Sequence, residues 1–315
     1  MESIPLQVSE WPWYYVAVYF FLGGIAAGAY LIAAIADVFG DSKEDAPLIK
    51  IGHYLAVILI IICPLLLIAD LGRPERFWRM LTQFKWDSPV SLGSWGLLLF
   101  GLFAGLSAVI WMAEDGFFEK GPLKSLNFIG QELHRLPRRL IARVGALFGI
   151  FVAGYTGVLL SSTTNPFWSS NQFLGITFLT SALSTAIAVV SILLIWRGHG
   201  KLIALHNFRN LWLIVLGFEV FLVAWEVLHH EEGALLLTGQ FLFTFVIAVA
   251  VVGVLIPLIL LAMNVGKPMS NSMLILIAVL VLIGGFFFRY SVLVAGQEFI
   301  EAAVEQAMLL SGSFG

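Results

Sequence analysis

Long apolar runs, separated by charged or proline-rich breaks, follow one another along almost the whole chain. Eight can be traced, at about residues 14–38, 49–71, 91–113, 140–162, 172–196, 211–228, 239–263 and 272–295. Each is close to the roughly 20 residues with which an α-helix crosses the hydrocarbon core of a bilayer. Backbone amides in lipid must be paired within helices or a closed barrel, and these runs are too long for barrel strands. The pattern predicts an all-α integral membrane protein, a bundle of eight transmembrane helices that forms a single polytopic domain over residues 1–315.

The segment at 297–311 has a different pattern from the eight runs. Glu298, Glu301 and Glu305 fall on one helical face, and apolar side chains fall on another. This spacing predicts a short amphipathic tail outside the membrane. Its acidic face is repelled by anionic lipid, so both a protein partner and the membrane surface stay open as its neighbour.

The composition excludes an ordinary soluble enzyme. Hydrophobic residues make up 60% of the chain and charged residues 12%, with a mean hydropathy of +0.95, whereas soluble domains average about 45–50% apolar and about 25% charged. The net charge of −3 provides no basic field, so no nucleic-acid partner is expected.

The distribution of Lys and Arg predicts the orientation. Eight spans place both termini on one side, and that side carries four cations, Arg73, Arg76, Arg79 and Lys85. The opposite loops carry twelve: Lys43, Lys50, Lys120, Lys124, Arg135, Arg138, Arg139, Arg143, Arg197, Lys201, Arg209 and Lys267. Because cytoplasmic loops are enriched in Lys and Arg, we expect both termini on the outer, periplasmic side of a bacterial inner membrane.

Metal-binding residues are scarce in the sequence. Cys63 is the single cysteine, and His53 is the one histidine within a predicted span. Iron–sulfur clusters and thiolate zinc sites need several cysteines, and a membrane haem commonly needs histidines on facing helices. We therefore expect no metal, haem or iron–sulfur cluster in this protein, which leaves a bound organic cofactor or a partner subunit to carry electrons.

Glu219, Glu226 and Arg289 lie inside predicted spans, where ionisable side chains are costly and mark functional candidates. Glu219 and Glu226 share a face of the sixth span, two turns apart. They could form a proton path, or they could form interhelical hydrogen bonds or pair with Arg289. Arg289, in the eighth span, is expected to pair with a carboxylate among Asp70, Glu219 and Glu226, or to hold a polar headgroup.

Further polar candidates are a turn at the predicted outer interface and a phenol in the middle of the fourth span. Asp70 and Arg73 flank a turn with Gly72 and Pro74 at the end of the second span. Asp70 could form a capping salt bridge with Arg73, or could exchange protons with a ligand that enters from the bilayer. Tyr155 lies between small residues in the fourth span, where its phenol needs a partner, either a ligand carbonyl or a neighbouring backbone carbonyl.

These segments resemble the NrfD and polysulfide reductase membrane subunits. The most specific match is Asp-Leu-Gly-Arg-Pro at 70–74, followed by Arg-Phe-Trp at 76–78. The other matches are Tyr-Phe-Phe-Leu-Gly-Gly-Ile-Ala-Ala-Gly at 19–28, Tyr-Thr-Gly at 155–157, Pro-Phe-Trp at 166–168, Arg-Tyr at 289–290 and Ala-Gly-Gln at 295–297.

The resemblance implies an inner-membrane anchor that exchanges electrons between the quinone pool, with menaquinone as the expected type, and a four-cluster iron–sulfur subunit. That subunit would serve a catalytic subunit with molybdopterin or with a multihaem cytochrome. The resemblance also implies a quinone among the first four helices near the outer face. Asp70 would handle protons, Tyr155 would bond a quinone oxygen, and Arg73 would steady the carboxylate or meet the partner, while Tyr19, Gly23 and Arg289 would complete the quinone surroundings.

Our hypothesis from the sequence is a quinone-interacting membrane subunit of a respiratory oxidoreductase complex, not an enzyme on its own. Two alternatives stay open. One is a transporter or proton translocator that uses Glu219, Glu226 and Arg289, although no internal repeat of the kind common in transporters is evident. The other is a scaffold without a quinone site.

Overall fold

The chain folds as a helical bundle in a computed structural model that describes residues 13–41, 43–70, 73–118, 132, 135–200, 206–229, 235–239, 241–267 and 269–312. Within these ranges there is no β-strand, and eight helical segments are long and apolar enough to cross a membrane. The prediction of eight spanning helices is confirmed. They are α1 (Trp13–Phe39), α2 (Ala46–Asp70), α4 (Pro89–Glu114), α6 (Arg138–Ser161), α8 (Leu174–Trp196), α10 (His206–His229), the π-helix η4 (Leu242–Leu255) continued by α11 (Ile256–Met263), and α12 (Asn271–Gly312).

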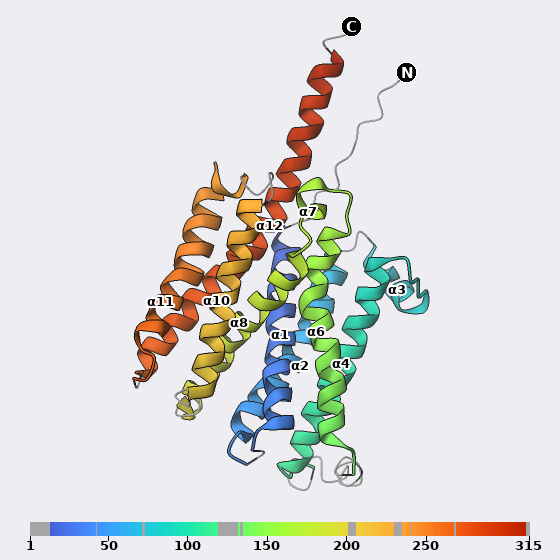
Figure 1. The fold of residues 1–315 in the computed structure, drawn as a ribbon. Coiled ribbons are helices and arrows are strands. Elements are labelled where there is room, and N and C mark those ends of the chain that lie inside the picture. The colour runs from blue at the N-terminus through green and yellow to red at the C-terminus, as the bar shows by residue number, and fades with distance from the viewer. Residues whose placement is uncertain are drawn as a thin grey trace.

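The spans form two groups of four. In the first, α1 and α6 pack on each other, and α2 and α4 pack beside them; in the second, α8 and α12 pack together with α10 and η4. Contacts of α1 with α8 and α12, and of α6 with α8, join the groups. Among the described spans α1 is the most enclosed, because its small residues allow neighbours to approach from several sides (Figure 1).

Two ends of the bundle can be distinguished in Figure 1. The start of α1, the end of α12 and the short helices α3 (Trp78–Thr82) and α7 (Pro166–Ser169) lie at one end, which we name the termini end. A 3₁₀ turn, η1 (Pro74–Arg76), leads into α3. At the opposite end, the loop end, Asp41 accepts the backbone N–H of Lys43 at 2.7 Å, and such bonds lower the pKa of its carboxyl.

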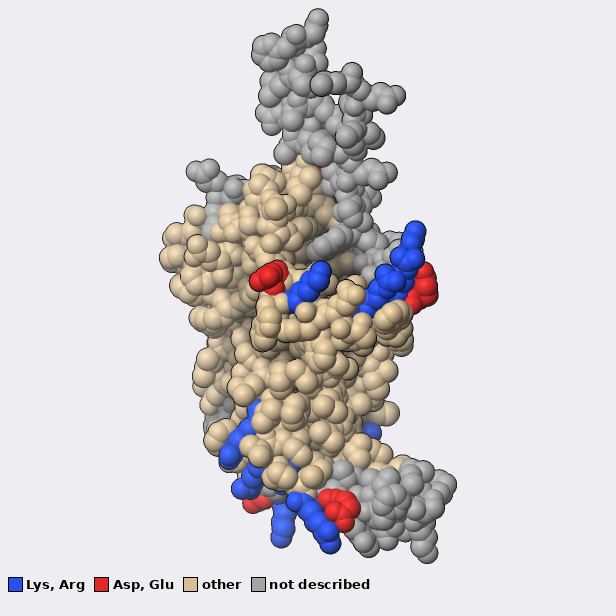
Figure 2. Space-filling view, turned by 90° about the vertical axis from the view of Figure 1, so that its right-hand side faces the viewer, with Lys and Arg blue, Asp and Glu red and all other residues tan. Residues whose placement is uncertain are grey.

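The outer surface supports a membrane location. Figure 2 shows a broad uncharged band between two levels of charged side chains. Large hydrophobic residues are exposed on the flanks of the spans, among them Ile61, Leu65 and Leu102. Such an apolar belt suits contact with lipid rather than with water. Which end faces the outside is not fixed by this geometry, so the outward orientation of the termini stays a prediction.

The segment at 297–311 continues the last span. The sequence pattern suggested a separate tail, but α12 runs unbroken over 42 residues and projects beyond the bundle (Figure 1). Two contacts hold its middle: Asn165 Nδ2 donates to the carbonyl of Gly296 at 2.7 Å, and Trp168 Nε1 donates to that of Val292 at 2.8 Å. With this support and no proline in the segment, nothing breaks the helix at the membrane surface.

Candidate functional site

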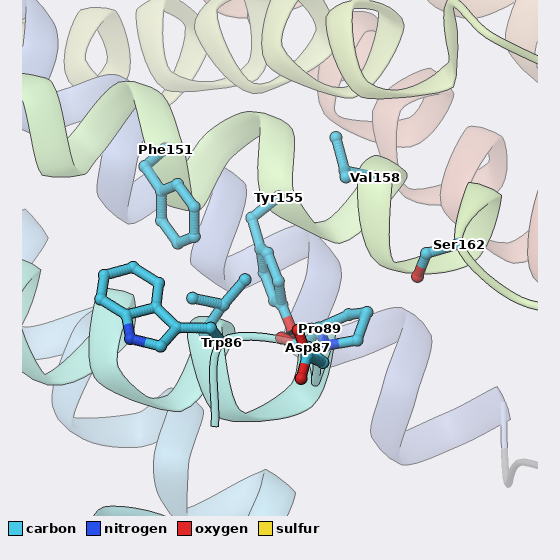
Figure 3. Close-up of a pocket in the computed structure, with 8 residues that line it drawn as sticks. Trp86, Asp87, Pro89, Phe151, Tyr155, Val158 and Ser162 are labelled. Atoms are coloured by element: carbon cyan, nitrogen blue, oxygen red, sulfur yellow. Dashed lines mark hydrogen bonds between the residues drawn. The ribbon is translucent and has the colours of Figure 1, made fainter. Parts of the chain in front are cut away.

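A cavity of about 180 Å³ lies at the termini end, between the start of α4 and the second half of α6 (Figure 3). Its wall is almost entirely apolar, and Val158 and Trp86 on its rim are exposed at the lipid-facing side of the bundle. The cavity therefore borders the exposed surface of the bundle at these two side chains. It is lined by Trp86, Asp87, Pro89, Leu92, Phe151, Tyr155, Val158 and Ser162.

Tyr155 is the one predicted site residue among those that line this cavity. Its ring is buried and stacks on Phe151, with centroids 5.3 Å apart and planes at 24°. Its hydroxyl donates to the backbone carbonyl of Pro89 at 2.6 Å. Of the two partners that the sequence left open, the structure shows the backbone carbonyl. The phenol oxygen keeps lone pairs with which it can accept a further hydrogen bond.

Two glycines of α4 make room for these rings, and the sequence analysis did not identify them. A Cβ on Gly93 would lie 2.0 Å from Cζ of Tyr155, and a Cβ on Gly96 would lie 2.2 Å from Cε1 of Phe151. Any larger residue would displace the rings. The available signal was the pair of glycines three residues apart at the start of the third span, a spacing that places both on one helical face.

The loop before α4 carries Asp87, another residue that the sequence analysis missed. This loop is fixed to the helix start: the Ser91 N–H donates to Ser88 Oγ at 3.3 Å, and the Lys85 N–H donates to Ser91 Oγ at 3.0 Å. Asp87 itself is exposed and lines the cavity together with Tyr155 (Figure 3). An anion just before α4 also lies at the favourable end of the helix dipole.

Asp70 and Arg73 lie at the same end of the molecule. Asp70 is the last residue of α2, but its side chain, like the turn residues Leu71 and Gly72, lies outside the described residues. Arg73 is exposed and precedes η1. The predicted pairing of Asp70 with Arg73, and the predicted roles of both, stay predictions.

Tyr19 and Gly23 lie on α1, away from the cavity wall. Tyr19 is 5% exposed and lies within electrostatic range of both Cys63 and Tyr155. A Cβ on Gly23 would be 3.7 Å from Cys63 Sγ, an ordinary contact distance. Tyr19 and Gly23 thus both belong to the first group of four helices but not to the wall of the cavity.

Arg289 and Glu219 belong to one buried network between α1, α8, α10 and α12. The Arg289 guanidinium donates to the carbonyls of Phe20 (3.1 Å) and Gly285 (2.7 Å) and to Ser181 Oγ (3.1 Å). The Glu219 carboxylate interacts with the Ser181 hydroxyl and with the charge of Arg289.

Arg289 forms no direct ion pair with a carboxylate among the described side chains. Arg289 Nη1 donates to Ser181 Oγ instead, and the hydroxyls of Ser184 and Ser181 lie close to Glu219.

Glu226 takes part in a separate contact. Its Oε1 accepts a hydrogen bond from Asn171 Nδ2, and both side chains are about 95% buried. This bond joins α10 to the segment between α7 and α8 rather than to another helix, and the proton path stays a prediction. Its second oxygen, Oε2, has no hydrogen-bond partner among the described residues.

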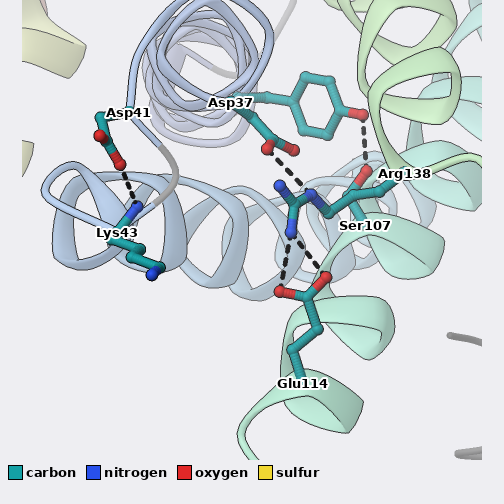
Figure 4. A network of polar contacts seen from close by, with 7 residues as sticks. Asp37, Asp41, Lys43, Ser107, Glu114 and Arg138 are labelled. Carbon is teal, nitrogen blue, oxygen red and sulfur yellow. Dashed lines mark hydrogen bonds and ion pairs between the residues drawn. The ribbon is translucent and has the colours of Figure 1, made fainter.

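A third polar network, missed from sequence, joins three helices at the loop end (Figure 4). Arg138 of α6 pairs with Asp37 of α1 (Nε to Oδ1, 3.0 Å) and with Glu114 of α4 (Nη1 to Oε1, 2.6 Å). Its guanidinium also lies over the Trp111 ring, 4.5 Å from the centroid. Asp37 is fully buried, so this network neutralises a charge inside the bundle.

In the described parts of the chain, no group of three or more His, Cys, Asp or Glu side chains is arranged to hold a metal ion. His53 is buried and packs edge-on against Tyr30, with centroids 4.8 Å apart. Among the described residues, the cavity at Tyr155 and the buried polar networks are therefore the features that could bind a ligand or move protons.

Comparisons with known proteins agree over most of the chain. The family described as polysulphide reductase, NrfD matches residues 5–301. A polysulfide reductase component of Wolinella succinogenes is 31% identical over 95% of this chain and 98% of that protein. An NrfD homolog of Haemophilus influenzae is 28% identical over 93% and 97%, and a tetrathionate reductase component of Salmonella typhimurium is 30% identical over 59% and 49%. With eight apolar helices and a family match over nearly its full length, this chain belongs to the NrfD family of multi-pass bacterial membrane proteins.

Proposed function

We propose that the protein is the membrane anchor of a respiratory oxidoreductase complex and exchanges electrons and protons between the quinone pool and an iron–sulfur subunit. The observation that carries this proposal is the cavity at Tyr155, which has a largely apolar wall with the exposed Val158 on its rim and polar groups at one end. A hydrophobic hydrogen carrier can reach such a site without leaving the membrane.

The cavity suits a quinone headgroup. Its volume of about 180 Å³ is below the roughly 300–1,000 Å³ of sites that enclose a whole drug-sized ligand. A fused ring fits this scale, with its isoprenoid tail left in the bilayer. Phe151 and Leu92 would contact the ring faces, and Tyr155 would bond a ring oxygen. Menaquinone is the proposed type.

The single cysteine of the protein and the names of its relatives indicate which partner subunits it needs. With one cysteine, it cannot hold an iron–sulfur cluster alone, so electrons must leave through another subunit. The relatives are named as parts of polysulfide, tetrathionate and selenate reductases. We assign a four-cluster iron–sulfur subunit, and beyond it a molybdopterin or multihaem catalytic subunit, as partners at the termini end, on the periplasmic side.

We assign each site residue a role in quinol oxidation. A bound quinol supplies two electrons and two protons. Tyr155 orients the ring through its hydroxyl oxygen. Asp70 accepts a proton at the surface and Arg73 steadies it or meets the partner, while Tyr19, Gly23 and Arg289 shape the polar interior behind the site. Changing Asp70 to Asn tests its share, because unchanged quinol turnover would remove Asp70 from the mechanism.

The proposal is tested by filling the cavity in the intact complex. Leu92→Trp places an indole in the cavity, and Leu98→Trp places the same indole on the exposed flank of the same helix. We expect Leu92→Trp to raise the Kd for a soluble naphthoquinone by about tenfold or more, equal to ~1.4 kcal/mol, and to slow quinol-dependent reduction of the iron–sulfur subunit. Leu98→Trp should change neither. Equal behaviour of both variants would exclude this cavity as the quinone site.

The buried network of Arg289, Ser181 and Glu219 favours a second candidate function, proton translocation by the same protein. Its charged members lie in the middle of the bundle, apart from the cavity. If it carries protons, Glu219→Gln should abolish quinol-driven proton movement in proteoliposomes and leave electron transfer running. Unchanged proton movement would assign the network a structural role.

A further inference from the structure

We infer that Asp87 is a catalytic proton acceptor of the Tyr155 cavity, which is built to receive the hydroxyl groups of a quinol. This inference rests on the proposed quinone site and names a residue that the sequence analysis did not assign.

The first step concerns the direction of hydrogen bonding at Tyr155. The hydroxyl hydrogen of Tyr155 is directed to the Pro89 carbonyl at 2.6 Å. The phenol therefore presents lone pairs to the cavity and accepts from a ligand. A quinol hydroxyl donates to such an acceptor, whereas a quinone carbonyl needs a donor. The polar end of the cavity thus offers the reduced carrier a hydrogen bond in addition to the apolar contacts that both redox forms make with the wall.

The second step is that Tyr155 cannot take the proton away. A phenol that already donates to a backbone carbonyl has no onward acceptor, since a carbonyl does not hold a proton at physiological pH. Among the described residues that line the cavity, Asp87 is the one carboxylate, and the other lining side chains do not accept protons at neutral pH. Asp87 and Tyr155 line the same cavity, at the end where the phenol reaches the start of α4 (Figure 3).

The third step is that Asp87 is held in place and in contact with water. The hydrogen bonds of Ser88, Ser91 and Lys85 fix its loop to the first turn of α4. Asp87 is exposed and forms no ion pair with any described residue. One side of the residue therefore faces the cavity, and a proton accepted there can pass directly to the aqueous phase at the termini end.

The chemistry balances. Oxidation of one quinol breaks two O–H bonds, passes two electrons to the iron–sulfur partner and releases two protons. Asp87 accepts the proton of the hydroxyl that lies against Tyr155. The second hydroxyl needs its own acceptor at the same end, the role proposed above for Asp70.

The test compares Asp87→Asn, Asp87→Glu and, as a matched control, Glu75→Gln in the intact complex. Glu75 is an exposed acid at the same end, away from the cavity. Each variant is assayed for affinity for a soluble naphthoquinone, for quinol-dependent reduction of the iron–sulfur subunit, and for the carboxyl band in redox-induced infrared difference spectra.

We expect Asp87→Asn to bind the naphthoquinone within about threefold of the unchanged complex, because its side chain keeps the same size. Its turnover should fall by about 100-fold or more, the usual contribution of a general base. Asp87→Glu should recover part of the rate, and Glu75→Gln should have no effect. The carboxyl band should be lost in Asp87→Asn alone.

Two outcomes would count against the inference, and they are distinguishable. If Leu92→Trp impairs quinone binding but Asp87→Asn keeps full turnover or the carboxyl band, the cavity is the quinone site and Asp87 is not its base. If the naphthoquinone binds Leu92→Trp as tightly as the unchanged complex, the proposed site is wrong, and the role of Asp87 is overturned with it.

Discussion

The position of Tyr155 depends on the absence of a side chain across from it. Its ring lies over Gly93 of α4, with Phe151 stacked beside it over Gly96. The hydrogen bond to Pro89 then fixes the hydroxyl at the start of the same helix. Three residues of α4 thus determine where a side chain of α6 meets the cavity.

We expect Gly93→Ala to impair quinol oxidation without unfolding the protein. The added Cβ would lie 2.0 Å from Cζ of Tyr155, so the ring must move. A displacement of about 1 Å in a catalytic group can cost roughly 100-fold in rate. Steady-state quinol oxidation by the complex measures the effect. Gly105→Ala on the same helix is the control, because nothing lies within 4 Å of its added Cβ; similar losses in both variants would contradict the assignment.

The sequence alone identified some members of the site and not others. Tyr155 was predicted because a phenol between small residues in an apolar span needs a partner. Asp87 and Gly93 were missed, because an acid in a loop and a glycine in a helix are common in any sequence. Their position at the Tyr155 cavity is known only once α6 is packed against α4. Arg289 and Glu219 were identified as buried charges, but Ser181, which accepts from Arg289 and lies close to Glu219, belongs to another helix and carries no charge to draw attention.

At the scale of elements, polar contacts hold helices together at both ends of the bundle. At the loop end, Arg138 joins α6 to α1 and α4 through Asp37 and Glu114. At the termini end, the α7 segment is bonded to α12 through Asn165 and Trp168. Between the ends, contacts are mainly apolar, and close approach depends on small residues.

We expect Arg138→Gln to destabilise the first group of four helices. Removing one partner of a buried pair leaves the fully buried Asp37 uncompensated, which costs about 3–5 kcal/mol in typical cases. Thermal unfolding in detergent, followed by circular dichroism, measures the loss. In the control Arg135→Gln, an exposed pair with Glu132 is broken, and the expected change is below about 1 kcal/mol. An unchanged melting temperature for Arg138→Gln would show that the pair does not stabilise the fold.

Facing glycines allow η4 and α12 to approach each other closely in the second group. A Cβ on Gly284 would lie 2.3 Å from Cα of Gly253, so Gly284→Ala must push two backbones apart. We expect a loss of about 1–3 kcal/mol, as for other overpacked interiors. Gly217→Ala in α10 is the matched control, since its Cβ would meet open space. Equal stability of the two variants would contradict the close packing of η4 on α12.

At the scale of the whole molecule, the fold was the most predictable feature. Apolar length alone gave the eight spans with ends within a few residues of those observed for most of them, because lipid leaves few alternatives to a spanning helix. The pattern could not show that residues 242–255 form a π-helix or that α12 continues to Gly312. These features depend on neighbouring helices and loops rather than on hydrophobicity.

The orientation can be tested directly. With twelve cations in the loops of one side and four on the other, the positive-inside tendency predicts the termini end in the periplasm. Alkaline phosphatase fused after the last residue should be active, and a fluorescent protein fused there, which requires the cytoplasm, should be dark. Fusions within the loop after Arg197 should behave in the opposite way. The reverse result would move the termini end, and the proposed partner subunits, to the cytoplasm.

The unbroken length of α12 has a mechanical consequence. At 1.5 Å per residue, its 42 residues extend about 63 Å, roughly twice the thickness of the hydrocarbon layer. Arg289 lies on this helix about 35 Å below its far end. A subunit that binds the projecting part therefore contacts the same continuous helix that carries the buried guanidinium of Arg289. A shift or rotation of this helix on docking would move Arg289 as well, because no break separates the two parts.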